Sequence, residues 1–319
     1  MIRRLEFRVL VYGGIALVLG GVALFGGPFY IQIAIGIGIY AILALAWDIL
    51  SRTGQVSLGM SAFFGIGGYG ASLLSPIFGT ILGWALGIFL CGAVAVLLGA
   101  VTLRLQRLYF TIATLSFSLA TQVLIIMTPD ITGGATGITP HVIGGGDPTT
   151  QLIIIAALVV VAAVVSDVFL GVRFRPAFFI IRNNPQLAAA SGIPVTQLKI
   201  LAFAFSGMIA GLAGACFTGL YGYVIPTDVF NTNWSILPLA ASILGGMDST
   251  LGPLLGAVIL SALEEVAKVL VGGVGYEAVY GAVIIIFVVG LPTGLLGLVR
   301  KLLRARLKAP ASAPQRRAA

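Results

Sequence analysis

The sequence predicts an all-α polytopic membrane protein with about ten transmembrane helices, some of them broken or re-entrant. Hydrophobic residues make up 59% of the 319 positions and charged residues only 9%, against roughly 25% charged residues in an ordinary soluble domain. Several apolar runs reach the about 20 residues that a helix needs to cross a hydrocarbon core. None shows the short alternating pattern of a membrane β-barrel, so helices are the expected spanning elements.

Apolar runs and the residues that interrupt them define the candidate spans. Spans are expected near 8–25, 29–50, 56–74, 80–103, 107–127, 151–171, 198–220, 235–247, 251–271 and 276–299. The first begins like a signal peptide, but no A-x-A-type cleavage site follows it, so a retained helix is expected. The third is rich in Gly and Ser and the eighth is too short to cross alone, so either of these two is expected to be broken or re-entrant.

Lys and Arg accumulate on the cytoplasmic side of membrane proteins, and this bias predicts the orientation. A cytoplasmic N-terminus puts nearly all cations inside: Arg3, Arg4, Arg8, Arg52, Arg104, Arg107, Arg173, Arg175, Arg182, Lys199 and the C-terminal tail. Only Lys268 falls outside. An odd number of spans would misplace one terminal cluster, which favours ten crossings and two cytoplasmic termini. Residues 1–299 then form the transmembrane domain, and 300–319 a basic, disordered tail that touches anionic lipid.

Several function classes find no support in the composition. The net charge of +8 comes from helix ends and the tail rather than from a folded basic face, which argues against nucleic acid as a partner. Cys91 and Cys216 lie far apart in apolar runs and are expected to act as small hydrophobes. His141 is the only histidine, so no metal cluster or catalytic triad is expected, and no cofactor. The chain is not expected to be an enzyme.

The segment 173–199 interrupts the apolar pattern between the sixth and seventh spans. Its four cations place it in the cytoplasm, because a Lys or Arg at the bilayer centre costs about 2.5–3.5 kcal/mol. Asn184 is a good N-cap and Pro185 suits the first helical position, while Gly192 followed by Pro194 predicts a C-terminal stop. A short helix is therefore expected over 185–191.

So short a helix is marginal by itself and needs a surface on which to dock. Ala188, Ala189 and Ala190 permit a close approach. From the residues alone, this surface is either the protein's own cytoplasmic face or the groove of a partner.

The stretch RNNPQLAAASGIPVTQLKILAFAFSGMIAGLAGA resembles the coupling segment of the permease subunits of branched-chain amino acid ABC importers, the LivM-like group. In that family the short helix inserts into a cleft of the ATPase subunit. The resemblance implies an ABC importer permease fold and a set of ATPase-coupling residues: Arg182, Asn183, Pro185, Leu187, Ala188, Ala189, Ala190 and Gly192.

Three further stretches resemble the same family in the same order along the chain. DILSRTGQVSLGMSAFFGIGGYGASLL is similar to its N-terminal signature, TGGATGIT to an external loop, and ILGGMDSTLGPLLGA to a late glycine motif. Asp48 stands where the family often has Asn, Gly68 where it often has Ala, and Asp248 where it has Gly. The resemblance covers the chain from end to end.

The stretch GIGGYG fits G-x-G-x-x-G, but no βαβ unit surrounds it, so it predicts close helix packing or a helix break rather than a dinucleotide site. No G-x-x-x-x-G-K-[ST] motif occurs. If ATP powers this protein, another chain must bind it.

On the fifth span Thr111, Thr114, Ser118 and Thr121 recur at spacings of three and four, which places four hydroxyls on one helix face. Such hydroxyls either hydrogen-bond between helices or line a weakly polar path. As candidates for the substrate pathway we take Gln55, Ser57, Phe63, Tyr69, Thr111, Thr114 and Ser118.

Charges are scarce in the middles of the spans, and no carboxylate or histidine chain suited to proton coupling is present. Asp48 lies four residues before Arg52 and is expected to pair with it on one helix face. Asp167 lies close to Arg173 in sequence. Glu264, Glu265 and Lys268 form either a surface patch or a dock for an external protein.

The resemblance implies a permease subunit of an ATP-driven importer in the bacterial plasma membrane. The implied partners are a second permease subunit, two cytoplasmic ATP-binding subunits and an external solute-binding protein, and the implied substrate is a branched-chain amino acid. Alternatives are a permease for urea or short-chain amides, and an ATP-independent channel or secondary transporter.

Overall fold

The computed structural model describes residues 27–140, 142–169, 171, 174–247, 249–271, 275–290 and 294–297. The predicted span 8–25, the tail 300–319, His141, Arg173 and Asp248 lie outside these residues. The elements in order are α2 (Pro28–Ser51), α3 (Met60–Phe78), α4 (Thr80–Thr102), α5 (Arg107–Ile126), α6 (Pro129–Thr132), η1 (Gly134–Thr136), η2 (Ile143–Gly146), α7 (Pro148–Phe169), α8 (Arg175–Asn183), α9 (Pro185–Ala190), α10 (Val195–Tyr221), α11 (Pro226–Val229), α12 (Asn233–Gly245), α13 (Leu251–Val271) and α14 (Tyr276–Gly290).

The architecture is a helical bundle, and the described residues contain no β-strand beyond one isolated bridge between Ile138 and Val224. Six of the described helices, α2, α3, α4, α5, α7 and α10, are long and apolar enough to cross a membrane. This agrees with the predicted polytopic membrane protein. The count of about ten crossings stays a prediction, because α12 and α14 are shorter and α13 carries Glu264, Glu265 and Lys268.

Helix α2 is the central element of the bundle. From Ala41 to Ser51 every residue is buried, and the helix packs against α7, α10, α12 and α13. Serines of two neighbours bond to its backbone: Ser206 donates to the Ala46 carbonyl (2.7 Å) and Ser242 to the Ala44 carbonyl (2.9 Å). These contacts hold α10 and α12 against α2.

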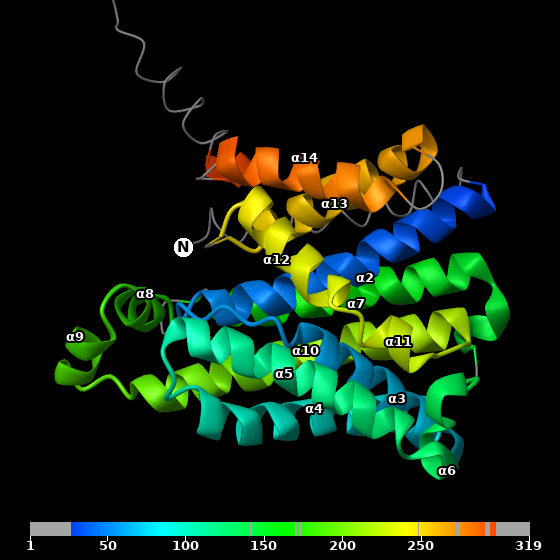
Figure 1. Cartoon of the computed structure of the whole chain (residues 1–319), viewed down its shortest axis with the longest axis horizontal. Coiled ribbons are helices and arrows are strands. Elements are labelled where there is room, and N and C mark those ends of the chain that lie inside the picture. The colour runs from blue at the N-terminus through cyan, green and yellow to red at the C-terminus, as the bar shows by residue number, and fades with distance from the viewer. Residues whose placement is uncertain are drawn as a thin grey trace, which may run out of the picture.

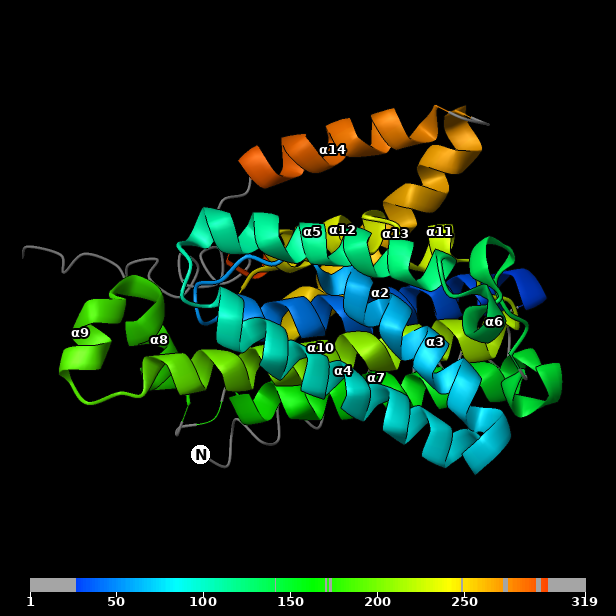
Figure 2. The ribbon, with the colours of Figure 1, turned by 60° about the horizontal axis from the view of Figure 1, so that its bottom comes forward.

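The long helices run roughly side by side along the length of the molecule (Figure 1). In both ribbon views α8 and α9 project together at one end, and α6 lies at the other (Figure 2). We call these the α9 end and the α6 end. The N-terminus of α10 and the C-termini of α2 and α7 lie at the α9 end, so these elements position the segment that follows α7.

Glycines allow α3 to pack very closely against α10, which is one of the two outcomes that GIGGYG predicts, and α3 runs through GIGGYG without a break. A Cβ atom added at Gly67 would lie 2.2 Å from the Gly211 carbonyl oxygen, and one at Gly214 would lie 1.9 Å from that of Phe64. The same closeness recurs between α12 and α13, where a Cβ at Gly245 would lie 1.7 Å from the Gly252 carbonyl oxygen. Only glycine fits at these crossings.

The third predicted span begins later than expected. The chain from 52 to 59 is not regular helix, and α3 starts at Met60 instead of near 56. Its backbone is held by side chains: Trp47 Nε1 donates to the Ser57 carbonyl (3.1 Å) and Thr111 Oγ1 to the Val56 carbonyl (2.7 Å). Irregular backbone is stable at depth only where protein surrounds it in this way.

The eighth predicted span is short, as expected. Helix α12 has 13 residues, about 20 Å at 1.5 Å per residue, against a hydrocarbon core of about 30 Å. Its N-terminus follows the segment 222–232, which contains α11 and packs on α3.

Candidate functional site

The segment between α7 and α10 forms two helices, where the sequence predicted one. Helix α8 precedes the predicted helix and buries Phe178 and Ile181, while Phe179 on its other side is exposed. Pro176 in its first turn is the signal that marks its start. This helix was not predicted because its buried face consists of only Phe178 and Ile181, and these lie among charged residues in the sequence.

Helix α9 begins where the sequence predicts and ends one residue earlier. Asn184 is the N-cap, with its side chain accepting a hydrogen bond from the Leu187 amide (2.9 Å), and Pro185 occupies the first turn. Gly192 has φ +76°, a left-handed value that favours glycine. The Ile193 amide donates to the Ala188 carbonyl and the Gly192 amide to that of Ala189, both at 3.0 Å.

These bonds form a Schellman motif, so the helix ends at Ala190 and not at the predicted Ser191, which is its C-cap.

The structure brings the predicted coupling residues together at the α9 end. One of them, Ala188, is fully buried and docks α9 on the bundle. Arg182 is half-buried, with Nη2 4.0 Å from Met247 Sδ. The other six are exposed: Asn183, Pro185, Leu187, Ala189, Ala190 and Gly192. The alanine-rich helix therefore has one face on its own protein and a second face directed outward.

The α5 hydroxyls hold the irregular segment 52–59 and the start of α3. Besides the bond from Thr111 to Val56, Thr114 Oγ1 accepts from the Leu58 amide (3.3 Å), and the Ser118 and Ser61 hydroxyls lie 2.8 Å apart. Thr121 bonds back to its own helix at the Phe117 carbonyl (2.8 Å). The predicted stripe thus makes contacts between helices.

Two serines that the sequence analysis did not select complete this contact. Ser235 on α12 accepts from the Ser61 amide (2.9 Å), and its hydroxyl lies 3.1 Å from that of Ser61. The hydroxyls of α3, α5 and α12 therefore meet at one buried point. Ser61 lies inside the motif SLGMSAFFG, but nothing in its spacing signals a partner 174 residues away.

Two of the pathway candidates keep a buried polar atom without a hydrogen-bond partner among the described residues: Gln55 Oε1 and the Tyr69 hydroxyl. Tyr69 stacks on Phe230, with ring centroids 6.3 Å apart. Ser57 and Phe63 are fully buried. Such unsatisfied groups are unusual in a folded protein and are candidates for contact with a polar solute.

Gln55 lines a cavity of about 270 Å³ at the α9 end. The other lining residues are Thr53, Gly54, Leu105, Gln106, Ile181, Pro185 and Lys199. The cavity therefore lies between the segment 52–59 and the start of α9. Gln55, a predicted pathway residue, and Pro185, a predicted coupling residue, therefore line the same cavity although they lie 130 positions apart in the sequence.

A buried ion pair forms at the C-terminal end of α2, as the four-residue spacing predicts, and its arginine also bonds to α7. Arg52 Nη2 pairs with Asp48 and also donates to Ser166 Oγ (2.8 Å), while Arg52 Nη1 donates to the Ser166 carbonyl (2.8 Å). Asp167 accepts a hydrogen bond from Thr250, which precedes α13. The charges of this region are thus used to connect helices.

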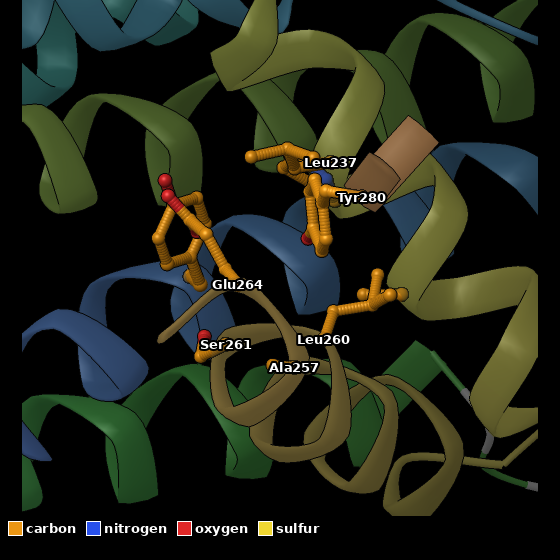
Figure 3. Close-up of a pocket in the computed structure, with 9 residues that line it drawn as sticks. Leu237, Ala257, Leu260, Ser261, Glu264 and Tyr280 are labelled. Atoms are coloured by element: carbon orange, nitrogen blue, oxygen red, sulfur yellow. The ribbon is translucent and has the colours of Figure 1, made fainter. Parts of the chain in front are cut away.

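At the α6 end Lys268 pairs with Glu264 (3.1 Å) and Glu265 (3.0 Å). These three residues border a cavity of about 300 Å³ whose walls include Tyr40, Tyr221 and Trp234. A neighbouring pocket, into which Glu264 of α13 and Tyr280 of α14 project (Figure 3), has a volume of only about 10 Å³. That is the space of one water molecule, too small for a solute.

No group of three His, Cys, Asp or Glu side chains in the described part of the chain could hold a metal ion. Cys91 and Cys216 are buried free thiols, and the Cys91 thiol bonds to the Phe63 carbonyl (3.3 Å).

Comparison with known proteins identifies the family of the chain. Residues 29–289 match the family described as "Branched-chain amino acid transport system / permease component". The high-affinity branched-chain amino acid transport system permease protein LivM of Salmonella typhimurium is 29% identical over 302 residues, which cover 84% of this chain and 70% of that protein. LivM of Escherichia coli is 28% identical over 300 residues, with the same shares covered.

A more distant relative, the ribose import permease protein RbsC of Bacillus subtilis, is 27% identical over 117 residues, 35% of this chain and 36% of that protein. No solved structure matches the chain. Since the family match spans nearly all of the described helices, the chain belongs to the family of branched-chain amino acid transport system permease components and is a LivM-like permease.

Proposed function

We propose that this chain is the transmembrane permease subunit of an ATP-driven ABC importer for branched-chain amino acids, working by alternating access. Its two LivM relatives carry that substrate class in their names. The observation that carries the proposal is the projection of α8 and α9 from one end of an otherwise apolar bundle, with the exposed face of α9 directed outward.

Helix α9 is well placed to receive force from an ATPase. Leu187 is 56% exposed although it is apolar, and a partner groove would cover it. Ala189 and Ala190 beside it allow a close approach. Asn183 and Arg182 flank this face and provide polar contacts. Movement of the ATPase pair would be transmitted through Ala188 to the bundle.

The solute path would begin at the α6 end and open toward the α9 end. Its candidate residues are Gln55, Ser57, Phe63, Tyr69, Thr111, Thr114 and Ser118. They carry hydroxyls, an amide and aromatic rings but no charge, so they would bind a zwitterion weakly. Weak binding suits a transporter whose specificity resides in the protein that delivers the solute.

The assembly would contain a second permease subunit, two ATP-binding subunits at the α9 end and a solute-binding protein at the α6 end. The α9 end would face the cytoplasm of a bacterium, because Arg52, Arg104, Arg175, Arg182 and Lys199 gather there. Both termini would then be cytoplasmic, and 300–319 would be a basic tail on the same side.

The central test replaces Ala189 by Trp. We expect Ala189→Trp to prevent co-purification with the ATP-binding subunits and to abolish ATP-dependent leucine uptake in proteoliposomes, because the indole would fill the space that the partner needs. Ala135→Trp, the same change at an exposed position of the α6 end, is the control and retains ATPase association. Full ATPase binding by Ala189→Trp would contradict the coupling assignment.

Uptake assays also separate the alternative functions. Transport of radiolabelled leucine that requires ATP supports the proposal, while ATP-dependent transport of urea or short amides without leucine supports the alternative substrate class. Solute flow in proteoliposomes that lack the ATP-binding subunits would instead identify a channel or a secondary transporter.

A further inference from the structure

The cavity of about 300 Å³ at the α6 end differs in chemistry from the proposed solute path. Its volume is at the lower end of the roughly 300–1,000 Å³ of small-ligand sites. Its walls come from α2, α10, α12 and α13. They combine carboxylates, aromatic rings and aliphatic side chains, so three kinds of contact converge on one space.

Two glutamates of α13 bring negative charge to this cavity. Glu264 and Glu265 both pair with Lys268, in each case through Oε1, at 3.1 and 3.0 Å from Nζ. Because two carboxylates share one ammonium group, these three side chains together carry one excess negative charge. The Glu264 side chain is only 13% exposed, so water and salt screen its charge less than that of a surface residue. A second cation beside Oε2 of either glutamate would offset the excess charge.

Four aromatic rings line the same cavity: Tyr40, Phe217, Tyr221 and Trp234. Trp234 stacks on Tyr40, with ring centroids 5.1 Å apart. The Phe217 centroid lies 5.3 Å from that of Trp234 and 4.7 Å from that of Tyr221. A wall fixed by such contacts needs little ordering when a ligand binds. Aromatic faces carry a negative potential and attract an ammonium group rather than a carboxylate.

The N-terminal half of α2 forms an apolar wall with Ile33, Ile37 and Ile39. Gly36 lies in the same wall, and a Cβ atom added there would meet nothing within 4 Å. The space beside Gly36 is therefore open, and its neighbours are aliphatic. A branched aliphatic chain would bury apolar surface there.

We propose that this cavity binds an amino acid through its ammonium group, which lies on Glu264 and Glu265 and beside the aromatic rings, while the aliphatic side chain lies along α2. The identity of the solute rests on the proposed function, whereas the preference for an ammonium group rests on the cavity itself. None of the proposed path residues lines this cavity. It is a separate site at the end where the solute would arrive.

The first test compares leucine with two analogues that each lack one of its charged groups. Isopentylamine keeps the ammonium group and isocaproate keeps the carboxylate. Isothermal titration calorimetry with the full chain in phosphatidylcholine nanodiscs measures binding, with empty nanodiscs as the blank. We expect leucine and isopentylamine to bind, and isocaproate to bind at least about tenfold more weakly, as for loss of one charged hydrogen bond.

Matched variants locate the site. Glu264→Gln and Asp130→Asn each remove one carboxylate at the α6 end, and only Glu264 lines the cavity. We expect Glu264→Gln to weaken isopentylamine binding about tenfold and Asp130→Asn to leave it unchanged. Gly36→Leu fills the cavity without changing a charge and should abolish binding. Gly281→Leu on α14, where a Cβ also meets nothing within 4 Å, should retain it.

The possible outcomes separate this site from the proposed function. Equal binding of isopentylamine and isocaproate, or unchanged binding by Glu264→Gln and Gly36→Leu, would overturn the site even if ATP-dependent leucine uptake is observed. Glutamate-dependent binding of isopentylamine without such uptake would support the site and contradict the proposed function. Loss of binding to an external solute-binding protein in Glu264→Gln, with no binding of either ammonium compound to the unmodified chain, would show a protein dock instead. Unfolding midpoints identify a variant that fails to fold, and the comparison of ligands on the unmodified chain does not depend on the variants.

Discussion

The contacts of Arg52 with Asp48 and Ser166 show which interactions of a single residue can be predicted from the sequence. The four-residue spacing predicts the ion pair, because residues i and i+4 share a helix face. The two bonds to Ser166 on α7 could not be predicted, since they join positions 114 apart. Local geometry is encoded within a turn, whereas the choice of a distant partner depends on the packing of whole helices.

Breaking the buried pair should destabilise the protein strongly. Arg52→Met removes the Arg52 cation from the buried Asp48 carboxylate, and we expect a loss of about 3–5 kcal/mol in the free energy of unfolding. The double variant Asp48→Leu, Arg52→Met should lose less than half of that, because both members of the buried pair are removed together. Thermal unfolding in detergent measures both, with the exposed Arg104→Met as the control, which should change stability by less than about 0.5 kcal/mol. Equal losses in the single and double variants would contradict this account.

In the candidate site, too, local contacts could be predicted and contacts between distant residues could not. Asn184 and Gly192 could be assigned from sequence because a cap needs only its own neighbours along the chain. The shared cavity of Gln55 and Pro185 could not, because it depends on how segments 130 positions apart pack together.

At the scale of elements, the length and apolar character of a segment predicted the helices well, and its ends less well. Each predicted span from 29–50 onward overlaps a helix among the described residues. Two predictions were wrong for the same reason. The late start of α3 could not be predicted because the backbone carbonyls of the segment 52–59 accept hydrogen bonds from side chains of other helices. Helix α8 was not predicted because Phe178 and Ile181 become buried only through contacts with the rest of the protein.

Close glycine contacts between α3 and α10 give a prediction at the scale of elements. Gly214→Ala places a Cβ 1.9 Å from the Phe64 carbonyl oxygen, so α3 and α10 must separate, and we expect a loss of about 1–3 kcal/mol. Gly36→Ala on α2 is the matched control, because its Cβ would have no neighbour within 4 Å. We expect that control to stabilise the helix by less than about 1 kcal/mol. Unfolding midpoints that fall equally for both would show that helix propensity, not the crossing, decides the effect.

At the scale of the whole molecule, the cations of the described residues gather at the α9 end, apart from Lys268, although they are spread along the sequence. The positions of Lys and Arg between the predicted spans indicated that these cations would share one end. The packing of α2 at the centre, with α4 and α5 at the periphery, was not predictable, because every span is apolar and lipid and protein interior select the same residues.

Cysteine labelling tests the orientation. Cys91 and Cys216 are at most 1% exposed, so they add little background. With a membrane-impermeant maleimide, we expect Thr136→Cys at the α6 end to react in intact cells and Leu187→Cys to react only in inside-out vesicles. The reverse pattern would place α9 outside the cell and exclude its contact with a cytoplasmic ATPase.

The continuity of α10 has a mechanical consequence. This helix starts at Val195, three residues beyond Gly192, and runs 27 residues to Tyr221 without a proline, about 40 Å at 1.5 Å per residue. It ends where the segment 222–232 begins, which covers Tyr69 with Phe230. Because an unbroken helix of this length resists bending, a shift passed from α9 across the turn at 191–194 to the start of α10 would reach the opposite side of the membrane within one rigid rod.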